Sequence, residues 1–127
     1  MIVDVHVHPP LPEWIEDGVG PYLESAERYF RKKVTAKPME DLAAEYEALD
    51  MVGVLLAWDA ETFTGRPPLP DETIAGIVER FPDRFVGFGC ADPHKFAAAE
   101  QVAANVEAGS WQLSTEQVEE ISQLVTG

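Results

Sequence analysis

Residues 51–58 read MVGVLLAW, and this uninterrupted apolar stretch decides the fold class. A short apolar run that carries no charge predicts a β-strand covered on both faces, as strands of parallel sheets are. Parallel neighbours need a crossover connection between them, which is usually a helix. We therefore expect a strand from Met51 to Trp58, with helices before and after it.

Two further strands are expected, one on each side of this stretch along the chain. Residues 2–8 read IVDVHVH and are closed by a pair of prolines at 9–10. Residues 84–90 read RFVGFGC and run into a turn at residues 91–93. Both segments combine apolar and β-branched residues with a bounding turn, which is typical of strands.

Helices are expected between and after the strands. Apolar side chains at helical spacing, together with the positions of proline, predict helices over residues 21–30, 38–49, 71–81, 96–107 and 114–125. Asp71 is the expected N-cap of the helix that it opens. Residues 9–20 and 62–70 are marked by proline and glycine and are expected to be irregular loops.

Strands that alternate with helices predict an α/β fold, with residues 1–127 forming a single domain. Three parallel strands are too few for a closed barrel, which takes eight strands and about 250 residues. The expected architecture is a partial (βα)-barrel of three parallel strands with flanking helices. Residues 1–96 would form the βα units and residues 97–127 a helical tail.

The charge and the cysteine content narrow the partners and the compartment. The chain has 9 basic and 23 acidic side chains, giving a net charge of -14, which disfavours nucleic acid and anionic membranes as partners. No apolar run approaches the roughly 20 residues of a membrane span, and the opening lacks a signal-peptide pattern. Cys90 is the only cysteine, so no internal disulfide is expected and a cytoplasmic location is predicted.

Three polar residues of the first strand, Asp4, His6 and His8, alternate with valines. Side chains two positions apart on a strand share a face, so the two imidazoles can converge on one divalent ion. Zinc, held at about 2.0–2.1 Å from each ring nitrogen, is the expected metal, with manganese as the alternative. Asp4 would either orient a ring or serve as a structural polar group. The alternative is that both histidines are partly exposed strand residues beside a turn.

Two aspartates follow the other strands. Asp59 comes after the second strand and Asp92 after the third, so both are expected on the same rim of the sheet as His8. Either could be a catalytic general base or a further metal ligand. The alternative is that each stabilises a turn by bonding its own backbone. His94 and Glu61 are weaker candidates, and His94 is more typical of a solvated helix start.

The opening VDVHVHPP resembles the Asp-x-His-x-His motif of the amidohydrolase superfamily. Over residues 1–96 the order of segments is similar to its amidohydrolase-related branch, which includes decarboxylases like aminocarboxymuconate semialdehyde decarboxylase. The supporting stretches are MVGVLLAWDAE and IAGIVERFPDRFVGFGCADPHK. The resemblance implies a barrel enzyme with His6 and His8 as first-strand metal ligands. That family completes its site with histidines of the fifth and sixth strands and an aspartate of the eighth, which these residues do not include.

Residues 100–124, EQVAANVEAGSWQLSTEQVEEISQL, resemble instead the carboxyl-terminal segment of aldo-keto reductases. Gln101 and Asn105 match positions that lie near the adenine end of NADPH in that family. The preceding HKFAAA lacks the residues that grip the cofactor phosphate, so nicotinamide binding is not inferred. The chain therefore resembles the first three units of one barrel joined to the last helix of another.

Three functions follow from these patterns. The first is a metal-dependent hydrolase or decarboxylase acting on a small organic substrate, at a site made partly by a partner chain. The second is a non-catalytic barrel fragment that folds by self-association and binds metal weakly or not at all. The third is a nucleotide-binding module inherited with the tail. Unpaired strand edges and an uncovered sheet face predict a homo-oligomer in the first two.

The tryptophans leave a separate choice open. Trp14, Trp58 and Trp111 either fill the core or line a pocket, and core filling is the favoured interpretation.

Overall fold

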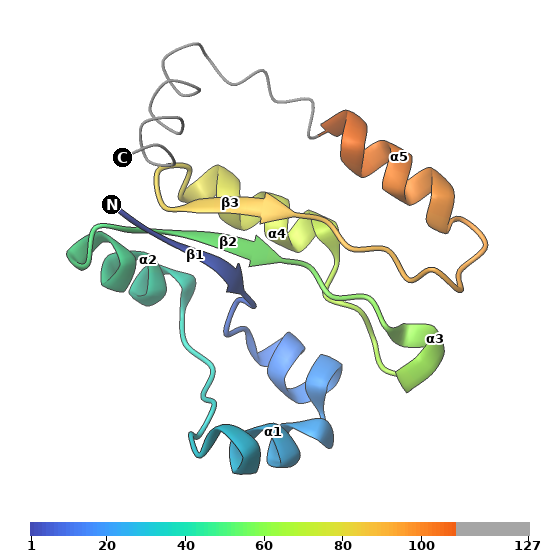
Figure 1. Ribbon diagram of the computed structural model, residues 1–127, viewed down its shortest axis with the longest axis horizontal. Helices are drawn as coiled ribbons and strands as arrows, with labels where there is room; N and C mark the ends of the chain where they lie inside the picture. The colour runs from blue at the N-terminus through green and yellow to red at the C-terminus, as the bar shows by residue number, and fades with distance from the viewer. Residues whose placement is uncertain (109–127) are drawn as a thin grey trace, which may run out of the picture.

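A computed structural model describes residues 1–108 and shows a mixed α/β fold (Figure 1). The predicted tail helix at 114–125 and Trp111 lie outside the described residues. The sheet contains β1 (Ile2–Val7), β2 (Met51–Leu56) and β3 (Phe85–Phe88), in the order β1-β2-β3 with parallel pairing throughout. The prediction of a three-stranded parallel sheet flanked by helices is confirmed.

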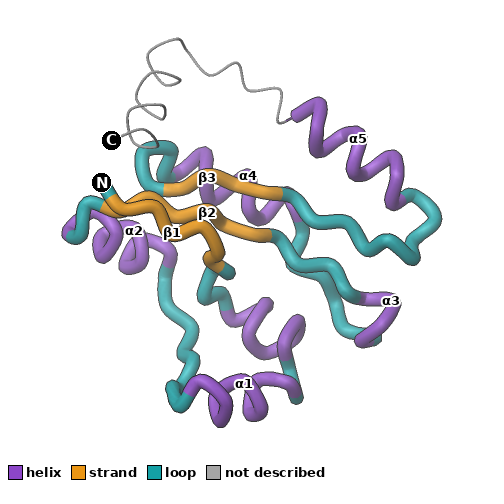
Figure 2. Tube along the Cα trace, viewed as in Figure 1, coloured by secondary structure: helices purple, strands orange, loops and turns teal. Residues whose placement is uncertain are grey.

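The helices fall mostly where apolar spacing placed them (Figure 2). They are η1 (Glu13–Val19), α1 (Tyr22–Phe30), α2 (Met39–Ala48), α3 (Glu61–Thr64), α4 (Asp71–Arg80) and α5 (Ala98–Ala108). Four of these match predicted helices, while η1 and α3 fall in segments that were expected to be loops. Within residues 1–108, no helix is long and apolar enough to cross a membrane.

Local bonding explains the two unpredicted helices. η1 is a wide π-type helix that ends with the Gly20 N–H donating to the Ile15 carbonyl at 3.2 Å, and Ile15 is buried. Burial of this apolar side chain stabilises the turn. α3 is a single turn, closed when Gly65 adopts φ 66°, a conformation that favours glycine. Because both segments are marked by proline, the sequence predicted loops there and these short helical turns were not expected.

The strands are shorter than predicted because neighbouring segments bond the residues at their ends. Trp58 leaves β2 to pair with Leu69 in an isolated antiparallel bridge, with N···O distances of 3.2 and 2.7 Å. Cys90 leaves β3, and its N–H donates to Asp71 Oδ1 at 2.9 Å. Each bond satisfies a backbone group that the sheet itself leaves unpaired.

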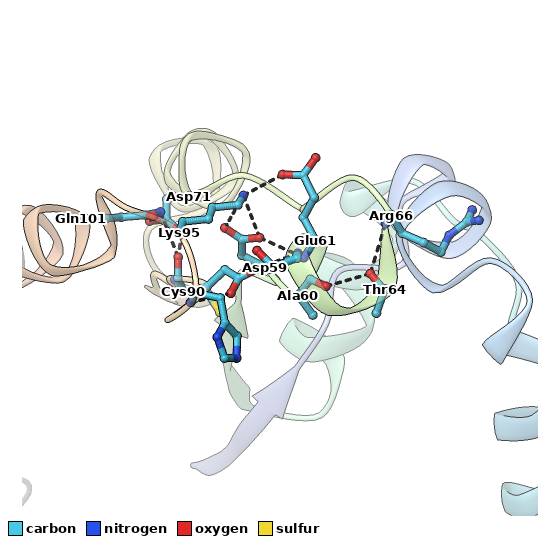
Figure 3. A network of polar contacts seen from close by, with 12 residues as sticks. Asp59, Ala60, Glu61, Thr64, Arg66, Asp71, Cys90, Lys95 and Gln101 are labelled. Atoms are coloured by element: carbon cyan, nitrogen blue, oxygen red, sulfur yellow. Dashed lines mark hydrogen bonds and ion pairs between the residues drawn. The ribbon is translucent and has the colours of Figure 1, made fainter.

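The prediction that Asp71 is a helix N-cap is wrong. Pro70 occupies that position, and Asp71 lies in the first turn of α4. The carboxylate of Asp71 instead accepts hydrogen bonds from Cys90 and, at 3.3 Å, from the Gln101 side chain (Figure 3). The Cys90 N–H after β3 and the Gln101 side chain of α5 therefore compete successfully with the helix for this carboxylate.

Helices α2 and α4 pack on the same face of the sheet. A Cβ atom at Gly53 would meet Tyr46 of α2, and one at Gly87 would meet Ile74 of α4. Gly53 pairs with Phe85, and Leu55 pairs with Gly87, so all four residues point the same way. This face carries the core, in which Leu55 is 0% and Phe85 1% exposed.

The opposite face of the sheet is the less covered one. It carries Val3, Val52, Val54, Val86 and Phe88. Phe88 is 57% exposed and Val3 48% exposed, while the central valines are half-buried. The expectation that β2 is covered on both faces is therefore wrong for residues 1–108, whose sheet-packing helices α2 and α4 share one side.

Candidate metal centre

The two histidines of the opening motif meet at the carboxyl end of β1. His6 lies within the strand and His8 just after it, and their Nε2 atoms are 3.2 Å apart. The ring centroids are 5.1 Å apart and the rings are nearly perpendicular, at 78°. The fold therefore brings together the two imidazoles that the sequence proposed as ligands.

This separation is compatible with a shared divalent ion. Two zinc–nitrogen bonds of about 2.0–2.1 Å at a near-tetrahedral angle place their nitrogens about 3.3 Å apart. The observed 3.2 Å lies close to that value. In the absence of an ion, the same distance suits a hydrogen bond between the rings, with one Nε2 donating and the other accepting.

His8 is held on several sides. Its Nδ1 lies 3.4 Å from the Leu56 carbonyl oxygen, and its ring stacks on Trp14 with centroids 4.8 Å apart. Trp58 approaches edge-on at 5.6 Å. When Nδ1–H donates to this carbonyl, Nε2 is left with the lone pair that a metal needs.

Burial also sets the charge state of His8. Desolvation lowers the pKa of His8 below its ordinary 6.5, and His6 acts in the same direction, while the Leu56 carbonyl opposes them. The neutral form, which is the ligand form, is therefore favoured at neutral pH.

Core filling was the favoured interpretation of the tryptophans, and the two described ones differ: Trp14 packs against the core, whereas Trp58 does not. Trp14 is half-buried and Trp58 is 38% exposed, and both contact the His8 ring. The sequence signal for a place beside the histidines was that both tryptophans follow closely after the ends of β1 and β2. Aromatic residues beside the carboxyl ends of parallel strands can flank a site as well as fill a core.

Asp4 does not join the imidazoles. The β1–β2 register shifts between Asp4 and Val7, which breaks the alternation expected to place Asp4 beside His6 and His8. Asp4 instead accepts a hydrogen bond from the Tyr46 hydroxyl at 3.0 Å and one from the His6 backbone N–H at 3.3 Å. Burial, and next this carboxylate, raise the pKa of Tyr46 to about 12. Asp4 thus has the structural role that the sequence left open as the alternative to orienting a histidine ring.

Asp59 lies after β2 and is held by a lysine. Both of its carboxylate oxygens accept from Lys95 Nζ, at 3.0 and 2.9 Å, and Glu61 binds the same ammonium at 2.8 Å (Figure 3). The two carboxylates, Glu61 foremost, raise the pKa of Lys95. Sequence reasoning missed Lys95, although a single cation placed close after Asp92 in an acidic chain was a usable signal.

Asp92 lies after β3 and is 2% exposed. Its two oxygens accept hydrogen bonds from the backbone N–H groups of Thr62, at 2.8 Å, and His94, at 3.0 Å. Bonds from Thr62 and then from His94 lower the pKa of Asp92 to about 2. These contacts match the turn-stabilising alternative for Asp92 and tie the loop after β3 to α3.

The remaining candidates do not complete a ligand set. His94 is exposed and contacts Asp92 through its backbone N–H. Across residues 1–108, no group of three or more histidine, cysteine, aspartate or glutamate side chains could hold a metal ion. In the described part of the chain, His6 and His8 are thus the pair of candidate nitrogen ligands that the fold brings together.

Comparisons with protein-family models, with curated proteins and with solved structures give no match in any of the three. They therefore assign no family to the chain. The resemblances of residues 1–96 and 100–124 stay predictions from the sequence.

Proposed function

We propose that the chain binds a divalent metal ion through His6 Nε2 and His8 Nε2, with zinc favoured and manganese the alternative. The observation that carries this proposal is the 3.2 Å separation of the two nitrogens. It is supported by the contact of His8 Nδ1 with the Leu56 carbonyl, which leaves Nε2 available. The expected class is a metal-dependent hydrolase or decarboxylase of the amidohydrolase type, acting on a small organic substrate.

The proposed architecture is a partial (βα)-barrel. In closed barrels of this kind helices form the outer layer, and functional residues gather at the carboxyl ends of the strands. Here α2 and α4 share one face, and His8 follows the carboxyl end of β1. Both features agree with three units of such a barrel.

A bound ion would polarise a water molecule or a substrate oxygen. Trp14 and the Leu56 carbonyl hold the His8 ring in place, which fixes the direction of its Nε2. Of the two aspartates, Asp59 is the better general base, because its partner is a side chain that can move away. Asp92 is held by two backbone N–H groups and would lose them on protonation or movement.

A second candidate function is a non-catalytic fragment that self-associates. It is favoured by the bonding of Asp59 and Asp92, since hydrogen bonds within the chain already occupy both carboxylates. Exposed apolar side chains such as Val5, at 71%, and Phe88, at 57%, would gain from burial in an assembly.

Calorimetric titration of the metal-free chain with zinc tests the proposed metal site. We expect saturable binding that falls at least about 100-fold in His6→Ala, because one of two chelating nitrogens is removed. His94→Ala is the matched control, since it removes an exposed imidazole outside the pair and should leave affinity unchanged. Equal affinity in His6→Ala and His94→Ala would contradict the proposal.

Zinc-dependent hydrolysis separates the two candidate functions. We would measure release of 4-nitrophenol from 4-nitrophenyl acetate by the chain with zinc, by His6→Ala and by His94→Ala. The enzyme proposal expects zinc-stimulated turnover that is lost in His6→Ala only. Zinc binding without stimulated turnover favours the non-catalytic fragment.

A further inference from the structure

A tetrahedral zinc site needs twice as many ligands as the histidine pair supplies. Structural zinc sites are almost always four-coordinate and tetrahedral, and imidazole is a common ligand. His6 and His8 supply two nitrogens, and no third histidine, cysteine, aspartate or glutamate joins them within residues 1–108. Any ion held here needs two further ligands from outside this set.

His6, the exposed member of the pair, lies where a second molecule can reach it, and the Nε2 of the half-buried His8 is 3.2 Å from the His6 Nε2. Strand β1 is at one end of the order β1-β2-β3, so one of its long edges has no neighbouring strand among residues 1–108. His6 is exposed, and the neighbouring valines Val3 and Val5 are 48% and 71% exposed. An open strand edge beside exposed apolar side chains is a surface that proteins commonly pair or cover.

We propose that zinc joins two copies of the chain, each contributing His6 and His8 to one four-histidine site on a two-fold axis. This inference rests on the metal-binding part of the proposed function, because it takes the histidine pair as the metal ligand set. Four imidazoles fill a tetrahedral zinc ion, so the shared site is structural, and hydrolysis would belong to the ion held by a single copy. A two-fold axis makes the two contributions identical, so two pairs give four ligands with no other residue required. Val3 and Val5 of each copy would be covered at the same contact.

Charge makes this association depend on the metal. Each copy carries a net charge of -14, so two copies repel each other. Neutral imidazoles add nothing to that repulsion, while a divalent cation between them opposes it. Two exposed valines per chain form a small apolar contact, so the ion must provide much of the attraction.

Light scattering after size exclusion, with zinc added in steps to the metal-free full chain, tests the inference. We expect the mass to rise from 14.0 kDa to twice that value and to saturate near one ion per two chains. A chelator should return the mass to that of the monomer. His6→Ala should stay monomeric with zinc, while His94→Ala should dimerise as the unmodified chain does.

The outcomes separate this inference from the proposed function. One zinc per chain at a mass of 14.0 kDa overturns the shared site and leaves the metal proposal intact. No zinc binding overturns both. A dimer that forms equally without zinc, or with His6→Ala, overturns the metal link and supports the non-catalytic fragment. Circular dichroism of His6→Ala, unchanged from the parent, confirms that loss of the exposed ring leaves the fold intact.

Discussion

Two regions on one rim of the sheet use polar side chains in opposite ways. At the end of β1, His6 and His8 meet each other through the nitrogens that a metal would bind. At the ends of β2 and β3, Asp59 and Asp92 are occupied by partners from the chain. One region holds its polar side-chain atoms against each other, and the other uses its polar atoms to close loops. Position on the rim alone therefore does not identify a reactive residue.

The largest expected effect that separates the two regions is on metal binding as the pH falls. Lowering the pH from about 7.5 to about 5 should weaken zinc binding by roughly 100-fold, because protons compete for the imidazoles. A competition titration with a chromogenic chelator at each pH measures this. Affinity that is flat across the interval would argue that carboxylates, not imidazoles, hold the ion.

The same pH change should leave the carboxylate region intact. The pKa of Asp92 is lowered to about 2, so this group stays ionised, and the stability it contributes is lost only below pH 3.8. His8 affects stability in a separate pH interval. Its pKa in the folded chain is lower than 6.5, so the stability that it contributes is fully present above pH 6.5 and is lost as the pH falls through the pKa of the folded chain. Thermal melts across these intervals report both.

The next effect is on folding. Asp92→Ala leaves the N–H groups of Thr62 and His94 without their acceptor, so the melting temperature should fall by roughly 5–10 °C. Differential scanning fluorimetry measures this, with Asp92→Asn as the control because it keeps one acceptor oxygen. Zinc affinity should not change. A variant that loses zinc affinity without loss of stability would make Asp92 a ligand instead of a loop residue.

A smaller effect is expected where aromatic rings support the histidine pair. Trp14→Leu removes the ring that stacks on His8 and should weaken zinc binding by roughly 3- to 10-fold. Phe63→Leu is a matched control, since Phe63 is 87% exposed. Zinc titration of both variants tests the idea, and an identical affinity in the two would remove Trp14 from the site.

The smallest effect belongs to the lysine that binds Asp59. Lys95→Met should lower the free energy of unfolding by less than about 1 kcal/mol, because the Lys95 side chain is 33% exposed and water screens the ion pairs. Urea denaturation at low and high salt measures this, with a smaller difference expected at high salt. A loss of unfolding free energy several times larger would show that the Lys95 ion pairs contribute substantially to the stability of the carboxylate region.

The sheet was accessible to sequence reasoning because its signals are strong. MVGVLLAW and the segments around Ile2 and Phe85 each combine apolar residues with a bounding turn, and each forms a strand. The ends of the strands were harder to predict, since Trp58 pairs with the backbone of Leu69 instead of continuing β2. Packing of the helices on a single face of the sheet could not be deduced from composition, because the sequence does not distinguish a half-buried valine from a buried one.

The site was predictable only in part. The convergence of His6 and His8 follows from their spacing, and the fold places them together. The displacement of Asp4 did not follow, because a register shift depends on pairing with β2 and leaves no local mark in the sequence. The partners of Asp59 and Asp92 also depend on tertiary packing, since Lys95 and Thr62 lie far from them along the chain.

The placement of α2 and α4 on a single side has a consequence for protein engineering. Within residues 1–108, the helices that pack on the sheet share one side, so a strand can be added at the outer margin of β3 without dismantling that layer. Fusing a further strand and helix there, or repeating the three units in tandem, would lengthen the sheet. The molecule thus offers a starting block from which wider parallel sheets can be built by duplication.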